Sequence, residues 1–256
     1  MAYQAVSVLC LPPGYTEWAA PAGLRHAIAC LWAQVTPEGG DREGLVLPDA
    51  CTDLVWVPGQ GAFVAGPDTG PVRTVMTAGT VMVGVRFRPC AGGPALGVPL
   101  SELRDLRVDL ADLRRRDAGR LPGTLDPDIA LARALDVAAA LVAAGEPDAA
   151  LTRAAALLAD PRARTGEVAA QLGLSLRQLR RRCHAAVGYG PKTLQRVLRF
   201  RRFVSRIDAA PAGRGSLDLA LLAAQAGYAD QAHLTRECGA LAGLTPAALA
   251  RQRALG

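Results

Sequence analysis

One sequence pattern occurs twice between residues 165 and 246, and it limits what this chain can fold into more than any other feature. Each copy has a small residue, a glycine four positions later, a polar residue that can cap a helix, and then an amphipathic stretch. The first copy reads Ala169-x-x-x-Gly173, then Ser175-x-Arg177-x-Leu179-x-Arg181-x-Cys183. The second reads Ala223-x-x-x-Gly227-Tyr228, then Asp230-x-x-x-Leu234-x-Arg236-x-Cys238. The order of the features predicts two helix-turn-helix units in tandem.

Each position of the pattern has a physical role in such a unit. The small residue lets two helices cross closely, and the glycine accepts the positive φ of the turn. Ser175 satisfies free backbone N–H groups at the start of the next helix. Exposed Arg and Gln near that start suit the DNA major groove, because Arg can bond guanine O6 and N7 and Gln can bond adenine N6 and N7. We expect seven side chains at DNA: Arg177, Gln178, Arg180 and Arg181 in the first copy, and Gln231, Thr235 and Arg236 in the second.

A long helix is expected between the two copies, over residues 191–207, opened by Pro191. At about 1.5 Å per residue it spans roughly 25 Å, and successive major-groove faces lie roughly 34 Å apart. With the width of each unit added, the spacing fits two adjacent grooves on one side of a duplex. Arg199, Arg202 and Arg206 form a basic stripe on this helix, which either contacts phosphates or is a solvated face.

The charge of the chain is divided unequally along its length. Residues 150–256 hold 17 basic and 6 acidic side chains, whereas residues 1–149 hold 12 and 17. A basic back half behind an acidic front half indicates a nucleic-acid partner for the back half only. The two helix-turn-helix units predict that this partner is double-stranded DNA. We find no signal segment and no apolar run of transmembrane length, so we expect a cytoplasmic protein with no membrane partner.

The front half has a different character. Residues 1 to about 113 are rich in Gly, Pro, Val and Thr, with extended stretches at 45–47, 53–57, 62–65 and 82–87. Their close spacing favours a small antiparallel barrel or sandwich over βαβ units. One helix is expected near residues 21–34, where Leu24, Ile28 and Leu31 share a face. A second should start at Asp126-Pro127 and run to about Ala144, packing within the chain or against a second copy.

The predicted fold class is therefore α+β. An N-terminal antiparallel β-barrel-like domain (residues 1–122) precedes a linker helix (123–147) and an all-α C-terminal domain with two helix-turn-helix units (148–256).

The C-terminal region from about residue 150 to 256 resembles the DNA-binding domain of the AraC/XylS family of bacterial transcriptional regulators. The first copy matches at the positions given above, and Gly188-x-x-Pro191 follows. The second matches as Ala224-x-x-Gly227-Tyr228-x-Asp230-x-x-His233-Leu234-x-Arg236, and Gly243-x-Thr245-Pro246 closes it. The resemblance implies two helix-turn-helix units joined by a long helix. Cys183 and Cys238 stand where the family usually has Phe, which implies a less bulky core.

The front half resembles, more loosely, an N-terminal domain found on some regulators of this family. The stretches that carry this resemblance are 46–49, 53–56, 65–69 and 83–89. It implies a cupin-like β-barrel that senses a small molecule, although a shared fold does not identify the ligand.

Candidate effector contacts lie in this front half. Arg86 and Arg88 alternate with apolar residues and could hold an anionic effector, or at least one of them pairs with Asp49, Asp53 or Asp68. Trp56 is a candidate wall of an effector pocket, with core packing as the alternative. Cys51 and Cys90 are read either as thiol sensors or as small buried hydrophobes, and the second role is the commoner one. His233 either touches a phosphate or packs.

Together these observations predict a non-enzymatic DNA-binding transcription regulator. The expected partners are promoter or operator DNA, a small-molecule effector that binds Trp56, Arg86 and Arg88, RNA polymerase, and a second copy of the chain in a homodimer. The sequence signals no catalytic residue, metal site or cofactor. A closed structural zinc site in particular is not indicated, because none of the six cysteines lies in a C-x-x-C pair.

Two enzymatic functions are the alternatives to a transcription regulator. A cupin-type metalloenzyme with accessory DNA binding needs clustered His and carboxylate ligands, and the front half has only His26. A DNA alkylation-damage response protein needs a reactive, metal-activated cysteine. The dispersed residues Cys10, Cys30, Cys51 and Cys90 show no such cluster.

Overall fold

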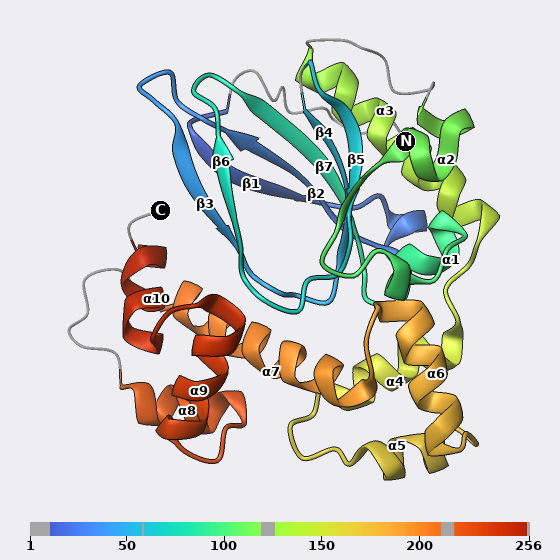
Figure 1. Cartoon of the computed structure of the whole chain (residues 1–256), viewed down its shortest axis with the longest axis vertical. Coiled ribbons are helices and arrows are strands. Elements are labelled where there is room, and N and C mark those ends of the chain that lie inside the picture. Colours follow the sequence, from blue (N-terminus) through green and yellow to red (C-terminus); the bar gives the residue numbers. More distant parts are fainter. Residues whose placement is uncertain (1–10, 58, 119–125, 211–217, 255–256) are drawn as a thin grey trace.

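The N-terminal half is built on a six-stranded antiparallel sheet (Figure 1). The computed structural model describes residues 11–57, 59–118, 126–210 and 218–254. The strand order in the sheet is β1-β2-β7-β4-β5-β8. Its strands are β1 (Gly14–Ala19), β2 (Ile28–Val35), β4 (Thr52–Val57), β5 (Gly61–Ala65), β7 (Val81–Phe87) and β8 (Arg107–Asp109). The predicted antiparallel, sheet-rich front half is therefore confirmed.

The remaining two strands form a separate ladder. β3 (Arg42–Val46) pairs with β6 (Val72–Met76) in a two-stranded antiparallel sheet. Within the described residues, hydrogen bonds therefore join the strands in two sheets and do not close them into one barrel. The short helical segments of this half include α1 (Gly92–Leu96), η3 (Leu100–Glu102) and α2 (Leu110–Ala118).

The helix α3 (Pro127–Ala144) covers one face of the large sheet and closes its core. Asp126 caps α3 as expected, since its carboxylate accepts hydrogen bonds from the backbone N–H groups of Asp128 and Ile129. The buried side of α3 packs with alternate residues of the central strands, among them Leu54, Trp56, Val83, Val85 and Phe87. Because this side of α3 is used within the chain, the helix packs in the first of the two ways expected.

The prediction of a helix near residues 21–34 is wrong. A single 3₁₀ turn, η2 (Ala22–Leu24), precedes strand β2. Most of β2 is buried on both faces of the sheet, so its sequence shows no alternation of polar and apolar residues. The three apolar residues that suggested a helical face are part of this continuous apolar run, and a run of that kind fits a central strand as well as a helix.

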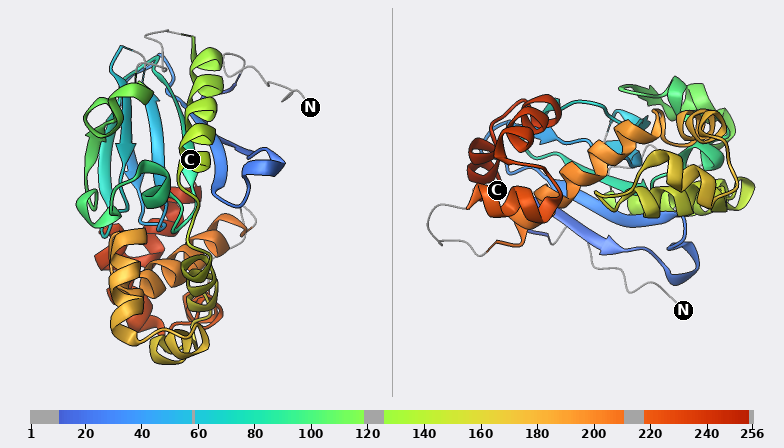
Figure 2. Two further views of the ribbon diagram at one scale, coloured as in Figure 1. Left: turned by 90° about the vertical axis from the view of Figure 1, so that its right-hand side faces the viewer. Right: turned by 90° about the horizontal axis from the view of Figure 1, so that it is seen from below.

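The rest of the described chain is helical. Its helices are α4 (Ala149–Leu158), α5 (Thr165–Gln171), α6 (Leu176–Val187), α7 (Pro191–Asp208), α8 (Leu219–Ala226), α9 (Gln231–Ala242) and α10 (Pro246–Ala254). The helix α7 crosses between two groups of helices, with α4, α5 and α6 at one end and α8, α9 and α10 at the other (Figure 2). No helix in the described ranges is both long and apolar enough to span a membrane.

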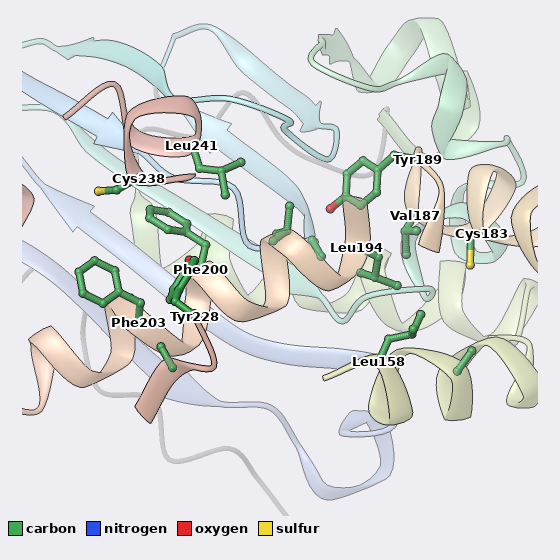
Figure 3. Close-up of a cluster of buried hydrophobic side chains, with 14 of the residues drawn as sticks. Leu158, Cys183, Val187, Tyr189, Leu194, Phe200, Phe203, Tyr228, Cys238 and Leu241 are labelled. Carbon is green, nitrogen blue, oxygen red and sulfur yellow. The ribbon is translucent and has the colours of Figure 1, made fainter. Parts of the chain in front are cut away.

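One core runs the length of α7 and joins both groups (Figure 3). Near the start of α7, Leu194 packs with Val187 and Leu158. Farther along, Phe200 and Phe203 pack with Tyr228, whose ring meets Phe203 edge-on at 6.5 Å. Since all these side chains are buried, the two groups form one packed unit.

The helical half also packs against the sheet half. Cys90 and Ala50 lie in the core of the helical half, and the Cys90 thiol donates to the carbonyl of Leu151 at 3.5 Å. A Cβ atom at Gly188 would lie 2.7 Å from Pro67 and 3.0 Å from the Leu100 carbonyl. The backbone at the end of α6 therefore sits directly on the N-terminal half.

Candidate nucleic-acid interface

The first helix-turn-helix unit is formed by α5 and α6. Gly173 adopts φ +66° in the turn between them. Ser175 and Gln178 form a reciprocal capping box. The Gln178 amide N–H donates to the Ser175 hydroxyl at 3.2 Å, and the Gln178 side chain accepts from the Ser175 N–H at 2.8 Å. Leu179 and Cys183 are buried beneath α6. These contacts fix where α6 begins and which side it presents to solvent.

The side chains that we expected at DNA on α6 lie on its exposed side. Arg177, Arg180 and Arg181 are all exposed. Gln178 is exposed too, but its side-chain oxygen is already used by the capping box. A Gln178 that also bonded adenine would have to give up this cap or share its oxygen, so the three arginines are better placed for readout.

The second unit, formed by α8 and α9, repeats the arrangement. Gly227 adopts φ +90° in the turn, and the Asp230 carboxylate accepts from the His233 N–H at 2.6 Å to cap α9. Leu234 and Cys238 are buried, at the positions that correspond to Leu179 and Cys183. The other expected contacts, Gln231, Thr235 and Arg236, are exposed on the outer side of α9.

His233 packs against Tyr228 and Glu237. Its ring meets Tyr228 edge-on at 5.2 Å, and its Nε2 lies 3.5 Å from Oε1 of Glu237. Of the two roles considered for this histidine, the structure shows the packing role.

The basic stripe on α7 is neither a solvated face nor an exposed phosphate-binding row. Arg199 donates to Glu237 at 2.7 Å and lies over the Tyr228 ring, 5.1 Å from its centroid. Arg202 donates to the carbonyls of Ala159 and Ala226, which lie at the C-terminal ends of α4 and α8. Arg206 donates to Gln225 at 3.0 Å. The spacing on the sequence identified one face of α7, but that face contacts neighbouring helices.

Glu237 is the acidic centre that fixes α9 to α7. It is buried, and it pairs with Arg196 at 3.2 Å and with Arg199 at 2.7 Å. Two guanidinium groups from α7 thus hold one carboxylate on the inner side of α9. This role could not be predicted from the sequence, because a single acidic residue on a helix usually lies on a solvated face.

The two units also meet where the backbone of Gly227 lies against the Pro161 ring. A Cβ at Gly227 would lie only 2.2 Å from Pro161, in the segment between α4 and α5. Because Arg202 bonds carbonyls on both sides of the same junction, the turn of the second unit is held against the first unit. The two exposed helices α6 and α9 therefore share one fixed relative orientation.

Both helices begin on the side of the molecule away from the sheets. The end of α6 contacts the N-terminal half at Gly188, and the end of α9 approaches it, since Gly243 lies beside Pro71. Each helix has 12 residues and so is about 18 Å long. Their N-terminal ends, which carry the expected DNA contacts, therefore lie on the opposite side, the lower one in Figure 1.

Comparison with known families decides what this arrangement is. Residues 168–252 match a family model described as a helix-turn-helix domain. The C-terminal region is an AraC-type helix-turn-helix domain. The chain is accordingly a DNA-binding transcription regulator. Residues 16–109 match a second family model, described as a domain of unknown function (DUF6597). No curated protein matches the sequence.

Similar solved structures are those of ToxT from Vibrio cholerae. An apo lysine variant of ToxT is 11% identical with a TM-score of 0.47, over 86% of this chain and 97% of that one. ToxT from strain O395 is 10% identical with a TM-score of 0.45 and the same coverage. Wild-type ToxT with a bound unsaturated fatty acid is 12% identical with a TM-score of 0.42, over 88% and 95% of the two chains.

The expected effector contacts lie on different faces of the sheet in front of the AraC-type domain. Trp56 is 1% exposed and packs in the core beneath α3. Arg86 alternates with the core residues Val85 and Phe87, so it lies on the opposite face. Arg88 donates to the carbonyl of Arg25 at 2.6 Å. The structure does not bring the three together, and their role in effector binding stays a prediction.

Arg86 is surrounded by carboxylates. Its side chain lies 3.1 Å from Asp53, 3.5 Å from Asp49 and 3.3 Å from Glu17. Trp32 donates to Asp53 at 2.7 Å on the same face. Burial, only partly offset by Arg86, raises the pKa of Asp53 to about 6, and the carboxylates around Arg86 raise the pKa of that guanidinium despite its burial. One of the two alternatives for Arg86, pairing with Asp49 or Asp53, is thus observed.

The described cysteines are buried free thiols. Burial raises the pKa of Cys30 and Cys90 to about 12 and that of Cys183 and Cys238 to about 11, and it raises the pKa of Cys51 as well. Such thiols hold little nucleophilic thiolate at neutral pH. Cys10 lies outside the described residues. Among the described residues no group of His, Cys, Asp and Glu is placed to hold a metal ion.

Proposed function

We propose that α6 and α9 read two adjacent major grooves on one side of a DNA duplex. The contacts would be Arg177, Gln178, Arg180 and Arg181 from α6, and Gln231, Thr235 and Arg236 from α9. Arg is suited to guanine, and Gln231 to adenine. The second helix is less basic than the first, so we expect it to contribute less affinity.

One observation supports this proposal above the others: two capped helices with exposed Arg and Gln side chains are locked to one another through α7. Arg202, the contact of Pro161 with Gly227, and the pairing of Glu237 with Arg199 all oppose independent movement of the two units. Helices that are held in one pose present their side chains to DNA with little loss of conformational entropy on binding.

The test is the affinity of the purified chain for its own upstream DNA, measured across a salt series for the wild type, Arg181→Ala and Arg236→Ala. Each substitution should cost about 1–3 kcal/mol on the specific duplex if the arginine bonds a base. Arg73→Ala is the control, because Arg73 is an exposed arginine on β6 in the other half. Binding that is equal for random DNA and indifferent to Arg181 and Arg236 would contradict the proposal.

For the N-terminal half we propose a regulatory role. A small molecule bound there would shift the population between DNA-competent and incompetent poses, provided that it binds the two poses with different affinity. Three carboxylates surround the single guanidinium of Arg86, so we expect this face of the sheet to favour a cationic or neutral effector over an anionic one. DNA affinity that is unchanged by every ligand found to bind the chain would count against this role. The homodimer and the contact with RNA polymerase stay predictions.

A further inference from the structure

A cleft of about 410 Å³ lies between the two helix-turn-helix units. None of the side chains proposed to contact DNA bases lines this cleft. Arg164 and Thr165 line it at the start of α5, Lys192 and Arg196 line it from α7, and Glu237 forms part of the wall from α9. The cleft is thus built from both units and from the helix that joins them.

The lining of the cleft is positive. Arg164, Lys192, Arg196 and Arg199 contribute four cations against the carboxylate of Glu237. Arg199 is largely committed to Glu237, whereas the Arg196 side chain is 43% exposed and meets Glu237 only through its Nε. Arg164 pairs with an exposed Glu167 at 3.4 Å. Lys192 is exposed and has no ion-pair partner in the described part of the chain.

The position of these residues on α7 shows which way the cleft faces. Lys192 and Arg196 are four residues apart and so share one side of the helix. Arg201 projects from the opposite side, toward the Cys51 thiol of the N-terminal half, where its positive charge offsets part of the rise that burial causes in that thiol's pKa. The cleft therefore lies on the side of α7 away from the sheets, the side on which α6 and α9 begin. This is the side seen in the right-hand view of Figure 2.

We propose that this cleft seats the phosphates of the DNA backbone that cross between the two major grooves. The inference rests on the two-groove proposal: when two helices enter successive grooves on one side, the backbone between them must pass over α7. A cleft with surplus positive charge at that place complements a polyanion. Lys192 is the principal cation of this seat, with Arg196 and Arg164 beside it.

Such a seat would set position and carry no sequence information. Phosphate contacts fix the register and orientation of a protein on DNA, whereas base contacts specify the sequence. Each neutralised phosphate adds about 0.9 to the slope of log K against log salt. Lys192→Gln should therefore weaken binding about three- to tenfold for all sequences alike and reduce the salt slope by about 1.

The first arm of the test uses Lys192 as its own reporter, because it is the only lysine in the chain. The full chain is treated with an amine-acetylating reagent, alone, with a selected specific duplex, or with inorganic phosphate at equal ionic strength. Arg73→Lys adds a reference amine on the exposed surface of β6. We expect the duplex to protect Lys192 from acetylation but not the amine introduced by Arg73→Lys. Inorganic phosphate should protect neither amine.

The second arm removes the charge from either partner. Duplexes that carry neutral methylphosphonate linkages midway between the two half-sites should bind the wild type about three- to tenfold more weakly. The Lys192→Gln variant should bind the modified and the unmodified duplex equally well, because this variant has already lost the phosphate contact. Arg201→Gln is the matched control, since it removes one positive charge from the opposite side of the same helix.

Three results would overturn the seat. In the first, Lys192 stays reactive toward the acetylating reagent when the duplex is saturating. In the second, inorganic phosphate protects Lys192 as well as DNA does. In the third, Lys192→Gln and Arg201→Gln change the salt slope of DNA binding equally. A wild type that binds every duplex alike would instead overturn the two-groove reading itself. Selective binding combined with an unprotected Lys192 would leave the reading proposal standing and remove only the seat.

Discussion

At the scale of single residues, Glu237 decides how firmly the second unit is held. Its carboxylate is buried between Arg196 and Arg199, so removal of the charge leaves two guanidinium groups with no carboxylate between them. We expect Glu237→Gln to lower the free energy of unfolding by about 2–4 kcal/mol in urea. Glu167→Gln is the control, because Glu167 pairs with Arg164 on the exposed surface and should cost less than about 1 kcal/mol. Equal effects of the two changes would contradict this account.

Asp53 should give the stability of the chain a measurable pH dependence. Its pKa is raised to about 6 in the folded chain, whereas an unfolded aspartate titrates near about 3.9. Folding therefore takes up a proton between these values, and this contribution to stability falls as the pH rises from about 4 to 6. The free energy of unfolding of the wild type, relative to Asp53→Asn, should drop by up to about 2–3 kcal/mol across that window. A flat difference, measured by urea titration at each pH, would contradict the assignment.

Residues whose role depends on neighbours along the chain could be predicted, and residues whose role depends on distant contacts could not. Ser175 and Asp126 cap helices as expected, because a cap needs only the next three residues. Arg199 and Arg202 looked like a surface stripe, since their partners Glu237, Ala159 and Ala226 lie 24 to 43 residues away. The positions at which α6 and α9 are exposed followed from the pattern, but the cleft at Lys192 required the fold.

At the scale of elements, the turn glycines Gly173 and Gly227 differ in what a side chain would meet: at Gly173 it would meet only backbone strain, and at Gly227 it would also meet close packing. Both have positive φ, but nothing lies within 4 Å of a Cβ at Gly173, whereas a Cβ at Gly227 would lie 2.2 Å from Pro161. Gly173→Ala should therefore cost about 1–2 kcal/mol from the left-handed backbone alone. Gly227→Ala should cost more in unfolding experiments, and it should also weaken DNA binding because it pushes the two units apart. Equal costs would mean that the Pro161 contact does not hold the units together.

The elements also show where periodicity is a sufficient guide. The repeats at α6 and α9 were predicted correctly, because each has one buried side and one exposed side. β2 was not, since Leu31 packs under α3 while Trp32 packs on the opposite face. A strand that is buried on both faces loses the two-residue alternation by which strands are found.

At the scale of the whole molecule, the N-terminal half contacts the C-terminal ends of α6 and α9. Gly188, at the end of α6, lies on Pro67 and Leu100, and Gly243, at the end of α9, lies beside Pro71. A change in the sheet half can thus reach both helices without touching DNA. The antiparallel character of this half was predicted from strand spacing, but its contact with both recognition helices could not be, because it joins segments more than 80 residues apart.

The central claim is that α6 and α9 read two grooves in one fixed pose, and the spacing of half-sites tests it most directly. Anisotropy titrations would compare a selected duplex, with half-site centres about 10 base pairs apart, with one in which about 5 base pairs are inserted between them. The insertion turns the second groove to the opposite side of the duplex. We predict that it lowers affinity to that of a duplex with one half-site. Equal affinity for both spacings would contradict the account.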